Sequence, residues 1–339
     1  MPAEIGIVVI GRNEGERLRR CLASVPKVSC DVIYVDSGST DGSVALARSL
    51  GADVVELDAS LSFSAARARN EGFDRALKLS PNAAFVEFVD GDCELAAGWI
   101  ERSVEEMMAS PEAGVVCGRV RERHREASVY HRLCDMEWNT PTGEVDACGG
   151  IFMVRVGAFR EAGGFDTSVV AGEEPELCLR LRQAGWRILR IGADMAVHDA
   201  AMTRFGQWWR RYVRCGYGYA LGNAMHGKGP AHHWVRETRS NWLWGLVLPM
   251  TVLAGVTTVT AWSLLLLITY PMWLFKVARY RRRIYGDAWS DALLYGAFCM
   301  LGKLPMAWGQ LRFVRDRLTG RSARLIEYRT SDRVEGQAT

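Results

Sequence analysis

The sequence lacks the glycine-rich signatures of two widespread nucleotide-binding folds. No G-x-G-x-x-G follows the first apolar run at residues 5–10, and no G-x-x-x-x-G-K followed by Ser or Thr occurs. Both motifs surround phosphates with backbone N–H groups, so the sequence gives no support to a dinucleotide-dependent oxidoreductase or a P-loop NTPase. The chain also has no internal repeat and no low-complexity segment.

The nine cysteines form no C-x-x-C pair, and their number is odd. Cys21, Cys117 and Cys178 lie inside apolar runs. This pattern is typical of reduced cysteines in a protein core and argues against a disulfide framework or a zinc site. No basic residue precedes the apolar run at residues 5–10. We therefore expect no signal peptide, and we expect the N-terminal part to stay in the cytosol.

The two parts of the chain differ in charge. The net charge is +3, but residues 1–203 carry 22 Lys/Arg and 32 Asp/Glu, a net of −10, and residues 204–339 carry 20 and 7, a net of +13. A basic segment attracts nucleic acid or anionic lipid. The second part also contains a run without any charge, residues 242–275. This run favours membrane lipids as partners over nucleic acid.

The charge-free run is 34 residues long. As one helix it would measure about 51 Å, too long for a hydrocarbon core of about 30 Å. We therefore expect a transmembrane or re-entrant hairpin over residues 241–276, with two spans of about 17 residues and a turn near Gly255. A further apolar segment, residues 292–308, contains a lysine and a proline. We expect this segment to lie in the membrane interface or to re-enter.

The N-terminal part alternates short apolar runs with helical patterns. The predicted strands are residues 5–10, 32–35, 53–57 and 85–89, and the predicted helices are one from about Glu14, 43–50 and 65–79. This alternation predicts an α/β fold with a mostly parallel sheet. Ligands of such sheets bind beyond the carboxyl ends of the strands. Asp36 and Asp90 both stand at such ends.

Asp90-Gly91-Asp92 follows the fourth predicted strand. Two neighbouring carboxylates repel each other unless a cation or a proton lies between them. Carboxylate oxygens suit Mg²⁺ or Mn²⁺, which also bind phosphate oxygens, and Gly91 leaves room for a bulky anion. The alternative is a solvated Asp-Gly turn. The buried strand before it favours a divalent cation site.

The segment GEEPELCLRLRQAGWRI, residues 172–188, has the pattern of a helix that starts near Pro175 and ends at Gly185. Glu173 and Glu174 then lie at the positive end of the helix dipole, which favours the ionised carboxylate that a general base requires. Simple charge complementation at a helix start explains the same pattern for Glu176 and remains open for Glu174.

Three further polar residues are candidates. Arg67 and Arg69 lie on the third predicted helix, and we expect one of them to face an anion while the other is solvated. His198 follows a short apolar run, where a lone histidine is more often structural than a metal ligand.

Together these segments resemble the family 2 glycosyltransferases of the GT-A fold, in their membrane-anchored bacterial form. The resemblance covers roughly residues 3–200 and rests on the order of six motifs: VVIGRNEG, YVDSGSTDGS, ARARNEG, FVDGDCEL, GGIFMVR with GGFD, and GEEPELCLRLRQAGWRI. It implies a hexosyltransferase that moves a sugar from a nucleotide diphosphate sugar with inversion, using Mg²⁺ or Mn²⁺.

The resemblance also implies roles for particular residues. Glu174 matches the catalytic base. The nucleotide-sugar-binding residues are Glu14, Asp36 and Asp90, and with them we place Arg69 as the arginine that faces an anion. The metal ligands are Asp92, Asp90 and His198.

The sequence departs from the family pattern at three places. Asp36 is followed by Ser37 where an Asp-Asp pair is common, Ile10-Gly11 replaces Pro-Thr, and Glu173-Glu174 replaces Glu-Asp. The first departure puts one contact to the nucleobase of the donor in question. The Glu173-Glu174 pair puts in question how the catalytic carboxylate approaches the acceptor. The Q-x-x-R-W motif of processive synthases does not occur, which favours the transfer of one sugar per encounter.

We accordingly expect four regions: a GT-A catalytic domain at residues 1–203, an interfacial amphipathic linker at 204–240, the hairpin at 241–276, and a basic helical tail at 277–339, cytosolic or interfacial. The catalytic domain would face the cytosol at the cytoplasmic membrane, and Trp208 with its basic neighbours would rest on lipid headgroups.

The expected acceptor is a lipid-linked glycan or another glycan, in polysaccharide (for example exopolysaccharide) or glycolipid synthesis. The alternatives are a polyprenyl-phosphate glycosyltransferase, a sugar nucleotidyltransferase and a catalytically dead membrane scaffold.

Overall fold

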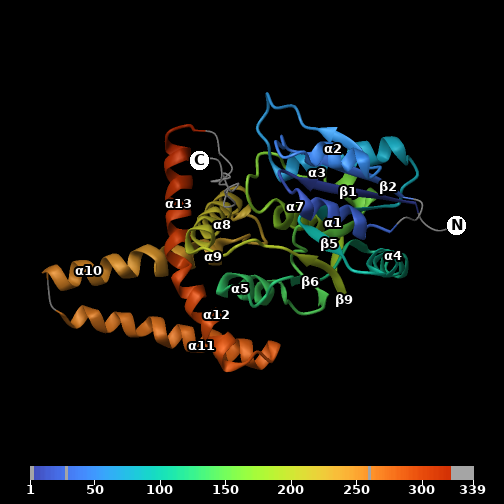
Figure 1. Ribbon diagram of the computed structural model, residues 1–339. Helices are drawn as coiled ribbons and strands as arrows, with labels where there is room; N and C mark the ends of the chain where they lie inside the picture. Colours follow the sequence, from blue (N-terminus) through green and yellow to red (C-terminus); the bar gives the residue numbers. More distant parts are fainter. Residues whose placement is uncertain (1–3, 27–29, 259–260, 322–339) are drawn as a thin grey trace, which may run out of the picture. The chain divides into compact units, whose positions relative to one another are not determined.

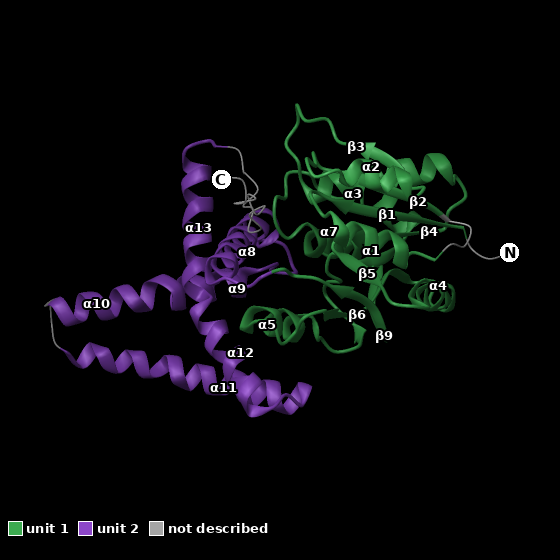
Figure 2. Ribbon diagram, viewed as in Figure 1, with its two compact units in different colours: residues 1–201, 331–339 green, residues 202–330 purple. Residues whose placement is uncertain are grey.

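The computed structural model describes residues 4–26, 30–258 and 261–321 of the chain. Within these residues the chain forms two compact units (Figures 1 and 2). The first ends at Ala201 and the second begins at Met202. We describe each unit separately. The first contains the polar motifs, and the second contains the long apolar segments.

The first unit is built on one mixed sheet. Its strands are β1 (Ile5–Gly11), β2 (Cys30–Asp36), β3 (Asp53–Glu56), β4 (Phe85–Asp90), β5 (Cys93–Leu95), β6 (Ala113–Glu122), β7 (Gly143–Glu144), β8 (Phe152–Arg155) and β9 (Arg187–His198). They follow the order β3-β2-β1-β4-β8-β6-β9-β5, and β7 pairs with β9. The first four strands of this order are mutually parallel. The α/β prediction with a mostly parallel sheet is therefore confirmed.

The strand register sets one polar edge. Ile10 of β1 pairs with Asp90 of β4, and the next residue, Gly11, pairs with Asp36 of β2. Because parallel strands end at the same edge of a sheet, the two acids that the sequence placed at strand ends lie along one edge.

Helices cover both faces of the sheet. They are α1 (Glu16–Ser24), α2 (Ser43–Ser49), α3 (Ala65–Leu79), α4 (Trp99–Ala109), α5 (Val129–Trp138), α6 (Val156–Glu161) and α7 (Glu173–Gln183). The helix α3 packs directly on β1, because a Cβ at Gly72 would lie 2.3 Å from Val8 Cγ1. On the opposite face, the buried Trp99 of α4 donates to Glu87 of β4 at 2.9 Å. Alternation along β4 thus sends Phe88 to one layer and Glu87 to the other.

All regular elements among the described residues of the second unit are helical. Its elements are α8 (Phe205–His226), α9 (Val235–Trp242), a π-helical turn (Leu243–Val247), α10 (Leu248–Thr258), a 3₁₀ segment (Ala261–Ile268), α11 (Thr269–Tyr285), α12 (Trp289–Leu301) and α13 (Lys303–Leu318). Two continuous stretches, Val235–Thr257 and Ala261–Tyr285, are long and apolar enough to cross a membrane by length and composition. Large apolar side chains project from them, including Trp262, which is 73% exposed.

The two stretches cover most of the charge-free run in which we expect a hairpin with two spans of about 17 residues. They contain 23 and 25 residues, and α10 ends at Thr258, three residues after Gly255, near which we expect the turn. The charge-free run did not mark the helix ends, because each helix continues into charged turns. The first begins with Arg236 and Glu237 near its start, and the second extends to Arg283. Charged residues are compatible with a helix wherever they lie outside the hydrocarbon core.

The expectation for Trp208 needs correction, whereas the one for residues 292–308 stays a prediction. Residues 292–308, which we expect to lie in the membrane interface or to re-enter, belong to two helices, α12 and α13, with Gly302 between them. Lys303 is accommodated there by donating to Asn241 Oδ1 at 2.9 Å. Trp208 is fully buried against Tyr212, with ring centroids 4.5 Å apart, so it does not rest on headgroups. The part of the basic tail at 322–339 lies outside the described residues.

Candidate active site

The turn after β4 stands at the centre of the polar edge. The Gly91 N–H donates to the Ile10 carbonyl at 2.8 Å, which ties this turn to the end of β1. A Cβ at Gly91 would lie 3.1 Å from that oxygen and 3.4 Å from Glu14 Cγ. The Glu14 side chain therefore lies beside the turn. A side chain at position 91 would crowd this carbonyl oxygen, and the structure brings Glu14 beside the turn that carries Asp90 and Asp92.

Asp36 occupies the same edge at the end of β2. Its carboxylate is buried and accepts the N–H groups of Gly38 and Ser39 at 2.9 and 2.7 Å, and the Tyr34 hydroxyl at 2.9 Å. Burial and the neighbouring Asp36 charge raise the pKa of the Tyr34 hydroxyl, which therefore stays protonated and donates. These contacts hold the loop after β2 in place, so Asp36 determines the shape of this part of the sheet edge.

Arg69 is the cation of the site. Its guanidinium is 2% exposed and lies 2.9 Å from Asp90 Oδ1, 3.2 Å from Glu173 Oε1 and 3.7 Å from Glu174 Oε1. It also donates to the Gly150 carbonyl at 3.2 Å. The anions that Arg69 contacts are therefore carboxylates of the protein itself. Arg67, on the same helix, pairs with Glu71 at 2.7 Å.

Glu173 and Glu174 open α7. The helix begins at Glu173 after Gly172, which has a φ of 84°, so Pro175 is its third residue and not its first as expected. Proline is still tolerated there because the first-turn N–H groups have no intrahelical partner. Burial and the charge of Glu173 raise the pKa of Glu174 to about 7, against the opposing effect of Arg69. Of the two side chains, Glu174 is the more accessible, with 17% exposed against 6%.

The glycine-rich segment before β8 lies directly against Asp90, Arg69 and Glu174. A Cβ at Gly150 would lie 2.7 Å from Asp90 Oδ2, 3.1 Å from Arg69 Nη2 and 3.3 Å from Glu174 Oε1. Only a residue without a side chain lets this backbone approach all three groups. The sequence showed that this piece was rich in glycine, but not that it lay against the acids.

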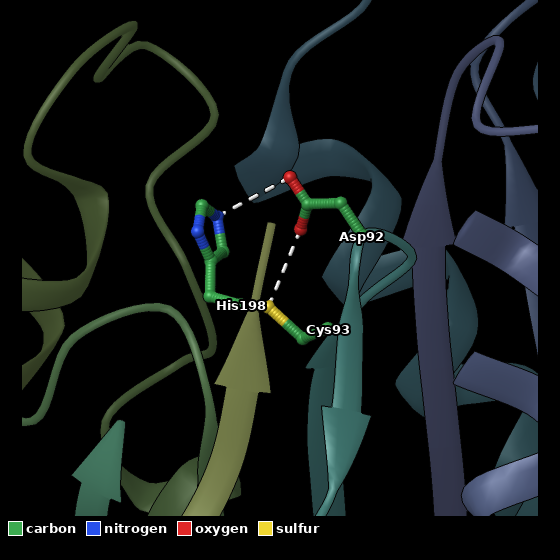
Figure 3. A group of neighbouring side chains, drawn as sticks. All are labelled: Asp92, Cys93 and His198. Carbon is green, nitrogen blue, oxygen red and sulfur yellow. Dashed lines mark hydrogen bonds and ion pairs between the residues drawn. The ribbon is translucent and has the colours of Figure 1, made fainter. Parts of the chain in front are cut away.

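A second cluster forms where β5 meets β9. Asp92, Cys93 and His198 each offer one ligand atom within 4.8 Å of the others (Figure 3). His198 Nε2 lies 3.3 Å from Asp92 Oδ2, and the Cys93 thiol donates to Asp92 Oδ1 at 3.3 Å. The antiparallel register Cys93↔His198 creates this meeting. Burial and the charge of Asp92 raise the pKa of the Cys93 thiol, which keeps it protonated.

The cluster fits a divalent cation. A carboxylate and an imidazole are ligands that Mn²⁺ accepts, and they converge here as metal ligands must. Of the three expected ligands, the structure brings Asp92 and His198 together, whereas Asp90 contacts Arg69 instead. Cys93 was not among the expected site residues. Its position directly after Asp92 was the only sequence signal for it.

Comparison with known families identifies the family to which the chain belongs. The family model "Glycosyl transferase family 2" matches residues 6–163, and the model "Glycosyl transferase family group 2" matches residues 86–281, more than half of the chain. The chain belongs to glycosyltransferase family 2. A glycosyltransferase of this family moves a sugar from a nucleotide sugar, so the family and enzyme class expected from the motif order are confirmed.

Two relatives show how low the sequence identity is between this chain and curated glycosyltransferases. The glycosyltransferase is 23% identical to glycosyltransferase AglE of Haloferax volcanii over 227 residues, which is 63% of this chain and 72% of that protein. It is 24% identical to the succinoglycan biosynthesis protein ExoA of Rhizobium meliloti over 240 residues, 65% of this chain and 69% of that one.

Among solved structures, the glycosyltransferase is similar to the mannosyltransferase PcManGT from Pyrobaculum calidifontis, which was solved in complex with GDP-Man and Mn²⁺. The TM-score is 0.63 at 16% identity, and the match covers 94% of this chain and 88% of that one. At this identity the likeness shows a shared fold, and it confirms the predicted GT-A architecture with a helical C-terminal region.

Proposed function

We propose that this glycosyltransferase transfers one sugar per encounter, with inversion at the anomeric carbon, from a nucleotide diphosphate sugar to a hydroxyl of a membrane-associated glycan acceptor. The observation that carries the proposal is Glu174. It is a partly accessible carboxylate with a pKa of about 7 at a helix start, beside the strand edge that holds Asp90. A general base acts best when its pKa lies near the working pH.

The proposed chemical step uses Glu174 as that base. Its carboxylate takes the proton of the acceptor hydroxyl while the hydroxyl oxygen forms a bond to the sugar C1. The bond between C1 and the diphosphate oxygen breaks at the same time, and the nucleoside diphosphate leaves with the electron pair. Attack from the face opposite the leaving group inverts the configuration. The sugar is bonded to the acceptor, and the proton is on Glu174.

The donor would lie along the polar strand edge. We assign Glu14, Asp36 and Asp90 to the nucleoside part, because these acids line the ends of three adjacent parallel strands. Asp92 and His198 would hold Mg²⁺ or Mn²⁺, which neutralises charge on a diphosphate. Arg69 is better assigned as a positioning residue than as a direct donor contact, since its guanidinium is buried among Asp90 and Glu173.

The acceptor side of the proposal rests on the second unit. Its two apolar stretches leave few side chains buried, with 17% and 6% of the most apolar windows inside the unit. A helix in the core of a soluble protein would be mostly covered, so these surfaces suit lipid. We propose that the stretches anchor the enzyme in the cytoplasmic membrane with the catalytic unit in the cytosol, where nucleotide sugars occur, and that the acceptor is lipid-linked.

A donor and acceptor screen tests the proposal. Purified protein in detergent is supplied with individual nucleotide sugars and Mn²⁺, with and without a lipid extract, and nucleoside diphosphate release is measured. We expect one donor to give release that depends on the lipid extract, and NMR of the product to show the inverted anomer. A retained anomer would refute the mechanism. Release that needs only a water-soluble glycan would refute the lipid-linked acceptor.

A further inference from the structure

Glu122 stands beside His198 on the side away from Asp92. It is the last residue of β6, and the parallel register pairs it with His198 at the end of β9. Its side chain is completely buried, and its Oε2 atom lies 3.6 Å from His198 Nδ1. On the other side of the ring, Nε2 lies 3.3 Å from Asp92 Oδ2. The imidazole therefore stands between two carboxylates, one in the proposed metal site and one behind it.

The carboxylate of Glu122 is held from both strands. Oε1 accepts the N–H of His124 at 3.2 Å, and Oε2 accepts the N–H of Ala200 at 3.2 Å. These two residues follow the ends of β6 and β9. The rings of Trp138 and His198 also pack edge to face, with centroids 4.6 Å apart. Both the ring and the carboxylate behind it are thus fixed in orientation.

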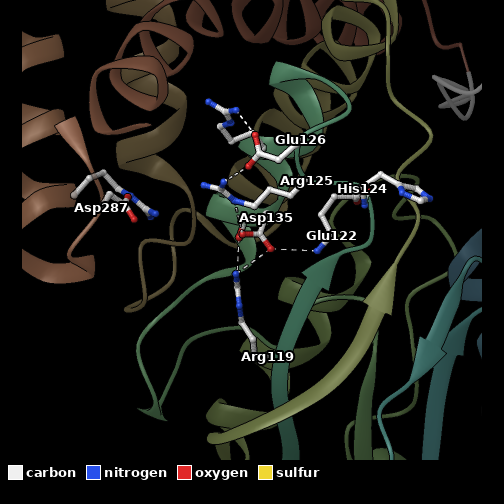
Figure 4. A network of polar contacts seen from close by, with 9 residues as sticks. Arg119, Glu122, His124, Arg125, Glu126, Asp135 and Asp287 are labelled. Carbon is white, nitrogen blue, oxygen red and sulfur yellow. Dashed lines mark hydrogen bonds and ion pairs between the residues drawn. The ribbon is translucent and has the colours of Figure 1, made fainter. Parts of the chain in front are cut away.

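A charged network then fixes the backbone of Glu122. Its N–H donates to Asp135 Oδ1 at 3.1 Å, and Asp135 belongs to α5 (Figure 4). Arg119 pairs with Asp135 at 3.1 Å, and Arg125 pairs with its other oxygen at 3.3 Å. The end of β6 is therefore anchored by two arginines through one carboxylate, and Glu122 has little freedom to turn away from His198.

We propose that Glu122 is a positioning residue for the divalent cation: it accepts the Nδ1–H of His198 and thereby directs the Nε2 lone pair towards Asp92. This inference rests on the proposed function, because it requires a cation at Asp92 and His198. Metal-binding histidines commonly donate their second ring N–H to a carboxylate, which fixes the tautomer and makes the ring a better ligand. Glu122 is placed for this role.

The Glu122→Gln substitution separates this role from a structural one. The amide keeps the shape of the side chain, but it cannot accept from all three N–H groups. If its NH₂ group faces Nδ1, the ring takes the tautomer with hydrogen on Nε2, and the lone pair is lost to the metal. Removing such partners typically weakens metal affinity about 10–100-fold. We expect a loss of Mn²⁺ affinity in that range in a protein that stays folded, with a lower melting temperature because one buried backbone N–H loses its acceptor.

The experiment is a double-mutant cycle on metal affinity. Mn²⁺ is titrated into the purified full chain in the presence of excess GDP, and separately of excess UDP, and the free ion is followed by electron paramagnetic resonance. E122Q is measured alone and in a His198→Ala background. If Glu122 acts through His198, E122Q has less than about a twofold effect once the histidine is absent. The matched control is Glu87→Gln, another buried carboxylate in the same sheet, which bonds to Trp99 at 2.9 Å. It should leave affinity unchanged.

Each other outcome has a distinct meaning. An equal loss from E122Q in both backgrounds would mean that Glu122 only supports the fold, and the inference would be wrong. Unchanged affinity in E122Q alone, with loss in Asp92→Asn, would also overturn it while leaving the metal site standing. If Asp92→Asn binds Mn²⁺ as tightly as the unsubstituted protein, or neither binds it, the metal site of the proposed function is itself wrong.

Discussion

Arg69 connects the two sides of the active site: its Nη2 atom lies 2.9 Å from Asp90 Oδ1 and 3.7 Å from Glu174 Oε1. One buried guanidinium thus balances a carboxylate on the donor side and the proposed base. Burial raises the pKa of Asp90, and the charge of Asp92 adds to this effect, whereas Arg69 opposes it. The charge state of the site therefore depends on a residue that we do not expect to touch either substrate.

The first prediction concerns the base. Because Glu174 must be ionised and its pKa is about 7, kcat/KM should rise with pH up to about 7 and then level. Glu174→Gln should lower turnover by about 10²–10⁴-fold with little change in donor affinity, since the loss affects the chemical step. Steady-state kinetics from pH 5.5 to 9 measure both.

Glu173→Gln is the control for this assignment. Removing the Glu173 charge removes a cause of the raised pKa of Glu174. The base would then ionise at lower pH, and the acid limb of the profile should move down while activity at pH 8 remains. If Glu173→Gln is the inactive variant and Glu174→Gln keeps its turnover, the base is Glu173.

The second prediction concerns Arg69. Arg69→Met leaves the buried Glu173 and the partly exposed Asp90 without their cation, and breaking a buried ion pair such as that with Glu173 typically costs about 3–5 kcal/mol. Without Arg69 the pKa of Asp90, which burial already raises, would lie higher still, so the loss of stability should be largest at pH 8 and smaller at pH 5, where this carboxyl group can protonate. Urea unfolding of the catalytic unit at both pH values measures this. Arg75→Met is the control. Arg75 lies on the same helix in an exposed pair with Asp53, and its loss should be minor at either pH.

The third prediction concerns Gly150. Gly150→Ala places a methyl group 2.7 Å from Asp90 Oδ2, and nothing in its backbone conformation forbids alanine, so the effect should be steric. We expect turnover to fall at least tenfold while the protein stays folded. Gly157→Ala in α6, where a Cβ would meet nothing within 4 Å, should keep full activity. Equal activity of the two variants would show that the loop does not close on the site during turnover.

The fourth prediction concerns topology. In a background without native cysteines, Ala261→Cys at the start of the second apolar stretch should react with an impermeant thiol reagent in intact cells. Arg321→Cys, after α13, should not react, because the proposal leaves the basic C-terminal part in the cytosol. Protection at both positions would indicate a re-entrant hairpin. Labelling at position 321 would mean an odd number of crossings and would contradict the membrane proposal.

The sequence by itself determined the elements and the family. Apolar runs such as residues 5–10 and 85–89 form strands because their side chains must be buried on both faces, and the acids at their ends mark the ligand edge. These patterns are local, so they can be read along the chain. The order of the polar motifs identified glycosyltransferase family 2 for the same reason, since each motif lies within a segment of fewer than 20 residues.

Only the tertiary structure decided which groups meet. The register of β5 with β9 brings Cys93 opposite His198, and that of β6 with β9 brings Glu122 beside the same ring. The sequence placed Arg69 on a helix but could not show its guanidinium buried among acids of other elements, nor Trp208 buried against Tyr212. Such contacts join residues far apart in the chain. They depend on strand pairing and helix packing, which arise from the simultaneous burial of many side chains and leave no local pattern in the sequence.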